Sequence, residues 1–239
     1  MSSDSIPLLR KRPNNKDSDD VRENMDEETR RETDRKYLIV YGVATALGTI
    51  ILIMVLVWLI LYGDGFGFST SGEYFCWHPL LMIFGFIFCY SQAMLIFRTG
   101  RNLQKYQLKL IHMVLNMSAL ILAILGITAA FASHAVRKPP TPDLYSLHSW
   151  IGITTVILFA LQFIIGFTAF LFPGYSPAQR ASLMPVHTAI GAAIFVCAIA
   201  AAVSGTTEKA IFTLGRQYQD LPSEGMFLNF IGYLLAIFG

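Results

Sequence analysis

Cysteine and charge are both scarce in this sequence of 239 residues. Its three cysteines, Cys76, Cys89 and Cys197, lie inside apolar runs, and none belongs to a CxxC or CxxCH pattern. They therefore make neither a disulfide framework, nor a cysteine zinc site, nor a covalent haem attachment site. Charged residues make up 14% of the chain, against about 25% in a soluble domain. With 54% hydrophobic residues, this composition is typical of a protein with several membrane spans.

The charges that are present gather in the N-terminal tail and between the apolar runs. The formal net charge of +2 therefore gives no indication of nucleic-acid binding. Residues 1–37 are polar and densely charged, with no apolar segment before them, which is not the pattern of a signal peptide. We expect a disordered cytosolic tail over 1–37 and a membrane domain over 38–239. Within the tail, DSIPLL at 4–9 has the form of an acidic dileucine sorting signal, with a chance pair of leucines as the alternative.

Six apolar runs follow the tail, each near the roughly 20 residues that a helix needs to cross about 30 Å of hydrocarbon. Helices are expected, because an open sheet would leave backbone groups unpaired in lipid. The sequence thus predicts an all-α polytopic membrane protein with six transmembrane helices. The sixth run is short and stops with the chain, as a truncated span would. The runs cover residues 38–62, 76–97, 110–132, 147–171, 186–206 and 225–239.

Positive charge is divided unevenly between the two sets of connecting segments. Nine Lys and Arg lie just before the first run, within residues 98–109 and at Arg180, against four in the other connections. Cytosolic segments carry the excess of Lys and Arg in membrane proteins. The N-terminus is therefore expected in the cytosol, and six spans return the C-terminus to the same side.

Four histidines lie near the ends of four successive runs. With this topology, His78 and His148 lie near the non-cytosolic face, whereas His112 and His187 lie near the cytosolic face. Two imidazoles that face each other across a helix bundle suit a flat macrocycle, because they fill both axial positions of a haem iron. Two such haems would stand on the order of 20 Å apart. They would allow electrons to cross the membrane.

The four histidines also have alternative roles, which stay open. A single histidine could hydrogen-bond between helices, but four at matched depths argue against that role. Zinc is less favoured, because no carboxylate or thiolate joins either pair at the same depth. A relay for protons or metal ions in a transporter or channel would also use intramembrane histidines, as would a purely structural haem protein. Small residues leave room for a macrocycle, although ordinary helix packing needs them too: Gly85, Gly126, Gly152, Gly166 and Gly191.

Short motifs surround these histidines over most of the chain. The most diagnostic is YSLHSW at 145–150, and the others are HPL at 78–80, AMLIFR at 93–98, KLIH at 109–112, FLFPG at 170–174 and PVH at 185–187. In these motifs the sequence resembles the cytochrome b561 family, the ascorbate-dependent dihaem transmembrane oxidoreductases. The resemblance covers about residues 40–239. One departure is Asn116, where some relatives have a further histidine that is not a ligand.

The resemblance implies the cofactors and the site of the electron donor. It implies two non-covalent haem b groups with His78, His112, His148 and His187 as axial ligands. Ascorbate, an anion, would bind at the cytosolic face to a set of cations: Arg98, Lys105, Lys109 and Arg180. Lys109 would also be catalytic, because it lies three residues before His112 and so one turn away on the same side. Positive-inside charge alone would explain the same cations.

On the other face, the resemblance implies that His134 helps to bind the electron acceptor and acts in catalysis. His134 is expected past the third run, in a loop, where its pKa range would suit proton exchange. Arg137, Lys138 and Trp150 are candidate neighbours. Gln162 and Asn229 are polar residues at lipid depth and are expected to bond to other helices or to haem propionates.

The predicted function is one-electron transfer from cytosolic ascorbate, through the inner and then the outer haem, to a luminal or extracellular acceptor. Ferric iron and monodehydroascorbate are the two candidate acceptors, and the sequence does not choose between them. The resemblance also implies a homodimer in a lipid bilayer. An endosomal, lysosomal or secretory-vesicle membrane is favoured, with the plasma membrane as the alternative.

Overall fold

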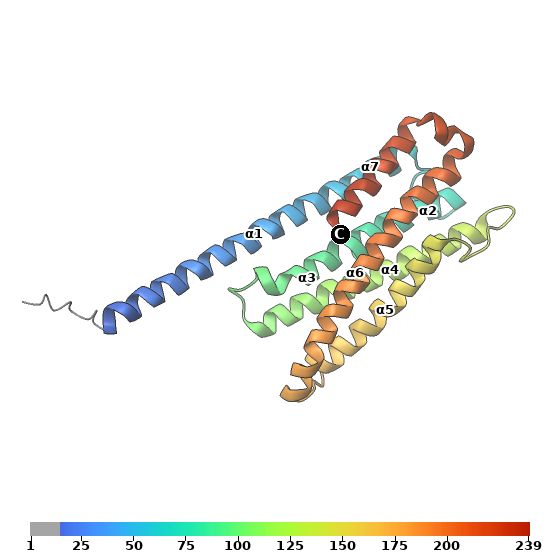
Figure 1. The fold of residues 1–239 in the computed structure, drawn as a ribbon. Helices are drawn as coiled ribbons and strands as arrows, with labels where there is room; N and C mark the ends of the chain where they lie inside the picture. Colours follow the sequence, from blue (N-terminus) through green and yellow to red (C-terminus); the bar gives the residue numbers. More distant parts are fainter. Residues whose placement is uncertain (1–14) are drawn as a thin grey trace, which may run out of the picture. The chain divides into compact units, whose positions relative to one another are not determined.

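The computed structural model describes residues 15–239, with side chains from residue 23 onward, and every regular element in that part of the chain is a helix. Two compact units are distinguished: one that reaches Val40 and one over Tyr41–Gly239. Figure 1 shows the elements in order. They are α1 (Asn15–Tyr62), α2 (Ser71–Leu81), a π-helix η1 (Met82–Cys89), α3 (Tyr90–Thr99), α4 (Lys105–Val136), α5 (Leu147–Phe170), α6 (Pro177–Leu214), a 3₁₀-helix η2 (Gly215–Asp220) and α7 (Ser223–Phe238).

Helix α1 begins well before the first apolar run, which differs from the disordered tail expected over residues 1–37. No proline or glycine interrupts residues 15–41. Two pairs with i,i+4 spacing, Glu27–Arg31 at 2.6 Å and Glu32–Lys36 at 2.9 Å, add helical stability. Most side chains here are exposed, as expected for a solvated segment. The DSIPLL stretch at 4–9 lies outside the described residues, and the division of the chain at residue 37 stays a prediction.

Five helices are long and apolar enough to cross a membrane, by length and composition. They lie within Glu23–Tyr62, Ser71–Thr99, Lys105–Val136, Leu147–Phe170 and Pro177–Asp220. The sixth run forms α7, which is apolar but has only 16 residues. Large apolar side chains such as Ile53, Ile121 and Ile164 stay exposed along these helices, as they would in lipid. The protein is an all-α polytopic membrane protein, as predicted.

Helices α2, α4 and α6 begin before their apolar runs, whereas α5 begins at Leu147 as predicted. The Thr70, Ser146 and Ser176 side chains each accept a backbone N–H of the first turn that follows, in α2, α5 and α6. Helix α4 also continues to Val136, four residues past the apolar run that ends at residue 132. The expectation that His134 lies in a loop is therefore wrong, since His134 belongs to the last turn of α4.

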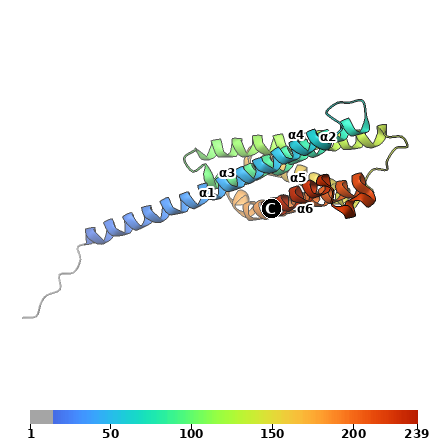
Figure 2. The same ribbon diagram turned by 90° about the horizontal axis from the view of Figure 1, so that it is seen from above.

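Within the second unit, α2, η1 and α3 pack along α4, α5 packs along α6, and α7 packs on α6 (Figures 1 and 2). The approach of η1 to α4 is close. A Cβ on Gly85 would stand 2.6 Å from the Leu122 Cβ. Ile51, Val55 and Trp58 of α1 are among the buried residues of the core.

A cluster of aromatic rings occupies the middle of this core. Tyr90 lies 4.6 Å from Phe159 and 5.5 Å from Phe195 between ring centroids, and Phe86 lies 5.0 Å from Phe159. All four are nearly inaccessible to solvent. The Tyr90 hydroxyl donates to the Gly191 carbonyl at 2.7 Å, which satisfies the one polar atom of the cluster.

Candidate functional site

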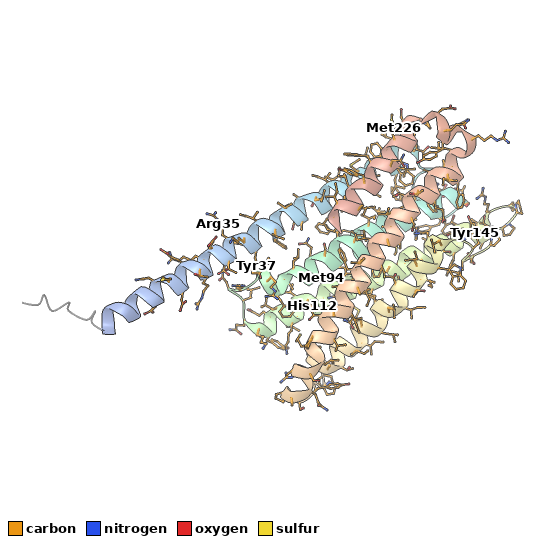
Figure 3. The ribbon with its side chains drawn as sticks, viewed as in Figure 1. Arg35, Tyr37, Met94, His112, Tyr145 and Met226 are labelled. Carbon is orange, nitrogen blue, oxygen red and sulfur yellow. The ribbon has the colours of Figure 1, made fainter. Side chains whose placement is uncertain are left out.

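The four helix-end histidines meet in the two predicted pairs. His78 of α2 and His148 of α5 have ring centroids 6.1 Å apart, and His112 of α4 and His187 of α6 have theirs 6.4 Å apart. We call these the outer pair and the inner pair. Figure 3 places His112 toward one end of the helices and Tyr145 toward the other.

Backbone carbonyls of neighbouring helices hold three of the four rings. The Nδ1 of His78 lies 3.0 Å from the Gly126 oxygen, that of His112 lies 2.7 Å from the Ala93 oxygen, and that of His148 lies 2.7 Å from the Ala201 oxygen. A carbonyl can only accept, so each Nδ1 carries the proton and each Nε2 keeps a free lone pair. Metal-binding histidines commonly have such a second hydrogen bond. The Nδ1 of His187 is buried and has no partner among the described residues.

The spacing within each pair fits one metal atom between the rings. An imidazole–metal bond is about 2 Å long, so two opposed imidazoles on one atom have centroids roughly 6.3 Å apart. A direct hydrogen bond of about 3 Å between ring nitrogens would bring the centroids to about 5 Å. Among the described residues, no group of three His, Cys, Asp or Glu side chains could hold a metal ion. A haem needs only the two axial ligands that each pair supplies.

Two glycines give the ligand rings of α5 and α6 their room. A Cβ on Gly205 would stand 2.7 Å from Cε1 of His148, and a Cβ on Gly166 would stand 2.9 Å from Cε1 of His187. Gly166 follows His148 by 18 residues, and Gly205 follows His187 by 18 residues. At 1.5 Å per residue the two pairs therefore lie about 27 Å apart along α5 and α6. Because α5 and α6 are antiparallel, the two pairs lie toward opposite ends.

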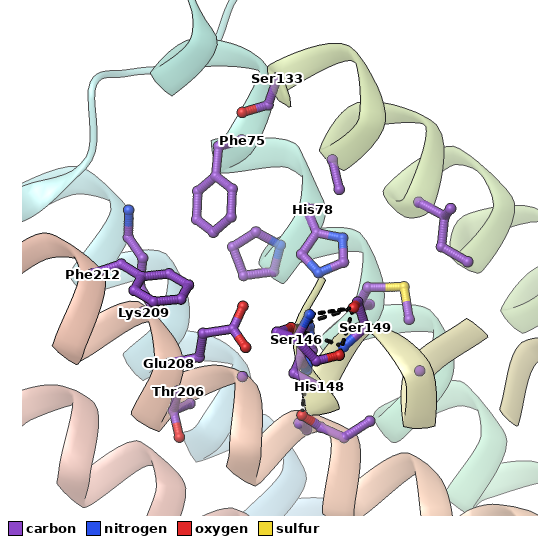
Figure 4. Close-up of a pocket in the computed structure, with 18 of the residues that line it drawn as sticks. Phe75, His78, Ser133, Ser146, His148, Ser149, Thr206, Glu208, Lys209 and Phe212 are labelled. Atoms are coloured by element: carbon purple, nitrogen blue, oxygen red, sulfur yellow. Dashed lines mark hydrogen bonds between the residues drawn. The ribbon is translucent and has the colours of Figure 1, made fainter. Parts of the chain in front are cut away.

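The outer pair opens into a cavity of about 550 Å³. His78 and His148 both line it (Figure 4). Its deep wall is apolar and includes Ile83, Phe86 and Ala198, whereas polar and charged residues gather at its other end. This combination of an apolar interior and a few polar groups is typical of a cofactor site. The polar residues include Asp64, Ser71, Arg137, Thr141, Tyr145, Glu208 and Lys209.

His134 lines the same cavity, and its Nδ1 lies 2.7 Å from the Asp143 carboxylate. The structure thus brings His134 to the outer pair, as the predicted acceptor role requires. Arg137 also lines the cavity, whereas Lys138 and Trp150 do not. Partial burial and the nearby charge of Glu208 raise the pKa of the Tyr145 hydroxyl.

The four predicted donor-site cations lie at the end of the helices that holds the inner pair. Arg98 belongs to the last turn of α3, Lys105 begins α4, and Arg180 belongs to the first turn of α6. The Lys109 ammonium donates to the Phe170 carbonyl at 2.9 Å, at the C-terminus of α5, where a cation is favourable. Its nearest charged neighbours are Arg180 and Lys105.

The polar residues at lipid depth bond to other parts of the protein. Asn116 donates to the His112 carbonyl at 2.7 Å, and Gln162 donates to the His187 carbonyl at 2.6 Å. Asn229 accepts from the Tyr218 hydroxyl at 2.8 Å. Two of the three side-chain amides thus position the backbone of the inner pair.

Comparison with known proteins supplies the family. Residues 77–213, which contain all four paired histidines, match the family described as eukaryotic cytochrome b561. The chain belongs to the cytochrome b561 family. Membership implies b-type haem as the cofactor, which agrees with the geometry of the two pairs.

Individual members of the cytochrome b561 family match over most of the chain. The plasma membrane ascorbate-dependent reductase of Mus musculus is 40% identical over 199 residues, 82% of this chain and 68% of the relative. The lysosomal membrane ascorbate-dependent ferrireductase of Homo sapiens is 40% identical over 199 residues, 81% of each. The transmembrane ascorbate-dependent reductase of Bos taurus is 41% identical over 192 residues, 80% of this chain and 75% of the relative.

Sequence reasoning missed several parts of this cytochrome b561 site. Gly205 could have been found, because it repeats the 18-residue spacing of His148 and Gly166. The carbonyls of Ala93 and Ala201 could not, because any residue type supplies a backbone oxygen. The partnership of Asp143 with His134 depends on how the chain folds after α4, which no local pattern specifies.

Proposed function

We propose that this chain is an ascorbate-dependent oxidoreductase that carries single electrons across a membrane, with one haem b in each histidine pair. The observation that carries the proposal is the pair of centroid separations, 6.1 and 6.4 Å, at opposite ends of α5 and α6. A haem with two imidazole ligands supplies one-electron chemistry at its iron and has no open coordination position. The names of the relatives support ascorbate as the donor.

The donor end is assigned to the inner pair. Arg98, Lys105, Lys109 and Arg180 gather there, and the positive-inside rule favours the cytosol for this end. Ascorbate is a monoanion, so charge-assisted hydrogen bonds from these side chains would hold it beside the inner pair. Lys109 lies one turn from His112 and is the cation best placed to orient the donor.

The acceptor end is assigned to the cavity at the outer pair. His134, oriented by Asp143 at 2.7 Å, lines that cavity and would contact the acceptor. The ferrireductase name of the human relative supports ferric iron, and monodehydroascorbate is the second candidate acceptor.

The alternative, a histidine relay for protons or metal ions, is less well supported. The two pairs lie about 27 Å apart along the helices, and the buried aromatic cluster lies between the parts of α5 and α6 that hold them. Three of the four Nδ1 atoms already bond to carbonyls. A relay needs a continuous series of exchangeable groups, which these contacts do not supply.

The wider assignments follow from the same proposal. Residues 1–37 and the C-terminus would face the cytosol, and residues 38–239 would form the membrane domain of a homodimer. An endosomal, lysosomal or secretory-vesicle membrane is favoured, with the plasma membrane as the alternative. Relatives from both a lysosomal and a plasma membrane support this pair of locations.

Reconstitution in ascorbate-loaded vesicles tests the function. The purified protein is inserted, external ascorbate is removed, and a membrane-impermeant ferric chelate or ascorbyl radical is offered outside. The proposal predicts that the external acceptor is reduced and that the internal ascorbate is consumed. Vesicles with His78→Ala and vesicles without protein are the controls and should be inactive. Equal reduction in protein-free vesicles, or none with the haem-loaded protein, would contradict the proposal.

A further inference from the structure

Lys209 is a cation in the wall of the outer cavity that belongs to none of the predicted sites. It belongs to α6 and follows Gly205 by four residues, so it lies one turn beyond the glycine that touches His148. Its Nζ stands 4.3 Å from the centroid of the Phe75 ring. The Phe75 ring is in turn 6.0 Å from the His78 ring. The Phe75 ring therefore lies between Lys209 and His78 in the wall of the cavity (Figure 4).

The ammonium of Lys209 has no carboxylate partner in the described part of the chain. No carboxylate oxygen there lies within 4.0 Å, and its close contacts are the faces of Phe75 and, at 5.9 Å, Trp58. Glu224 is nearby, but one of its oxygens accepts from the Trp58 indole at 3.2 Å. Lys209 is partly buried, and burying a charge is costly unless a partner compensates for its desolvation.

The same cavity is lined by a second cation, Arg137, and by two carboxylates, Asp64 and Glu208. Arg137 repels Lys209, whereas Glu224 and Asp64 attract it from beyond salt-bridge distance. None of these carboxylates lies within 4.0 Å of Lys209, so the ammonium can form a charge-assisted hydrogen bond with an anionic group of a bound molecule. The cavity is apolar at depth and polar at the other end. An amphiphilic group in it would therefore place its apolar part between the rings and its anionic groups near the cations.

We propose that Lys209 is the counter-charge for a carboxylate of the haem held by His78 and His148. The inference rests on the proposed function, since it requires a haem in the outer pair. A haem carries two carboxylates on one edge, and the polar end of the cavity offers Lys209 and Arg137 to that edge. Lys209 thereby fixes which way the edge points and adds a positive charge beside the iron site.

The positive charge has a consequence for the reduction equilibrium. Reduction adds one negative charge to the site, so a nearby cation favours the reduced form. Replacing Lys209 should therefore lower the midpoint potential of the outer site alone. About a tenfold change in the reduction equilibrium is expected, which corresponds to about 59 mV for a one-electron couple. Haem retention in the outer site should also fall, while the inner site stays unchanged.

The test compares Lys209→Gln with two matched variants in detergent-purified protein. Arg216→Gln removes a positive charge from an exposed position in η2, outside the cavity, and should leave both potentials unchanged. Lys209→Arg retains the charge and should preserve the outer potential. The measurements are the haem-to-protein ratio and a potentiometric titration followed by visible spectra.

The proposal is supported if one of the two haems in Lys209→Gln has a lower midpoint potential, or is partly lost, while the other haem is unchanged. Two fully retained haems with unchanged potentials would overturn it, even if ferric reduction slowed, because Lys209 would then act on the acceptor. If Lys209→Gln does not fold, Lys209→Met, which keeps the aliphatic stem, is titrated instead with the same criteria. Wild-type protein without haem would contradict the proposed function itself, and so the two failures are distinguishable.

Discussion

The orientation of each paired histidine depends on a group from another helix. His78 and His112 are held by carbonyls of α4 and α3, and His148 by a carbonyl of α6. These contacts leave Nε2 as the free nitrogen, and the glycines beside His148 and His187 allow each ring to lie against its neighbour. The residue type matters most at these two glycines, because any side chain there would collide with the neighbouring imidazole.

Gly205→Ala is expected to weaken the outer haem site while sparing the inner one. The new Cβ would stand 2.7 Å from Cε1 of His148, so the ring must move. Overpacking of this kind costs about 1–3 kcal/mol, roughly five- to more than a hundredfold in haem affinity. Gly166→Ala should have the converse effect through His187.

The measurement is the haem content of each variant and the spectrum of the haem that remains. Gly42→Ala is the matched control, because a Cβ there meets nothing within 4 Å. Full occupancy of both sites in Gly205→Ala and Gly166→Ala would show that these glycines do not position the rings.

Lys109→Ala is expected to slow reduction by ascorbate without changing haem content. The substitution removes a charge-assisted hydrogen bond to the donor, worth about 1.5–3 kcal/mol, or about ten- to hundredfold in affinity or rate. Reduction by dithionite should stay normal, because it needs no specific site. Lys109 also donates to the Phe170 carbonyl, so thermal stability is measured in parallel. If ascorbate reduces the variant at the wild-type rate at every concentration, Lys109 only caps α5 and contributes to the membrane orientation.

At the scale of the elements, hydropathy located all six apolar helices but not their ends. The apolar runs reveal which residues can lie in lipid, whereas helix ends depend on caps such as Ser146 and Ser176. Helix α4 continues past its apolar run and therefore contains His134, which was expected in a loop. The π-helix over Met82–Cys89 was not predictable either, because it depends on packing against α4. The pairing of the histidines was predictable, since alternating helix directions determine which chain positions lie at the same depth.

Phe159→Ala tests how far the aromatic cluster holds these elements together. Phe159 is 2% exposed and touches both Phe86 and Tyr90. Removing a buried aromatic ring costs about 3–5 kcal/mol, so the free energy of unfolding in detergent should fall by that order. Tyr90→Phe removes only the hydrogen bond to Gly191 and should cost about 0.5–1.5 kcal/mol. Equal effects of the two variants in denaturant titrations would show that ring packing is not the main contribution.

At the scale of the whole molecule, the predictions concern the orientation of the chain and the membrane in which it acts. The uneven distribution of Lys and Arg favours a cytosolic N-terminus, which is also the side on which a sorting signal at residues 4–9 could be recognised. The family supplies members from two membranes, the lysosomal and the plasma membrane. The predicted orientation and the predicted location are therefore linked, because the predicted signal would work only from the cytosol.

Replacing Leu8 and Leu9 with alanine is expected to move the protein from endosomes or lysosomes toward the cell surface. The change removes the two apolar side chains of the signal and leaves Asp4 in place. Fluorescence microscopy of the tagged full chain gives the location, and Leu38→Ala, a leucine outside the signal, is the control. The same location with and without the two leucines would make the pair a chance occurrence.

The haem-to-protein ratio tests the central claim most directly. Two histidine pairs, each spaced for one metal atom, predict two haem b groups per chain. Quantitative haem extraction and amino-acid analysis on purified protein should give a ratio of two for the wild type. His78→Ala and His187→Ala should each give one, with a different haem retained in each. A ratio of one in the fully loaded wild type, or loss of both haems from either single variant, would contradict the account.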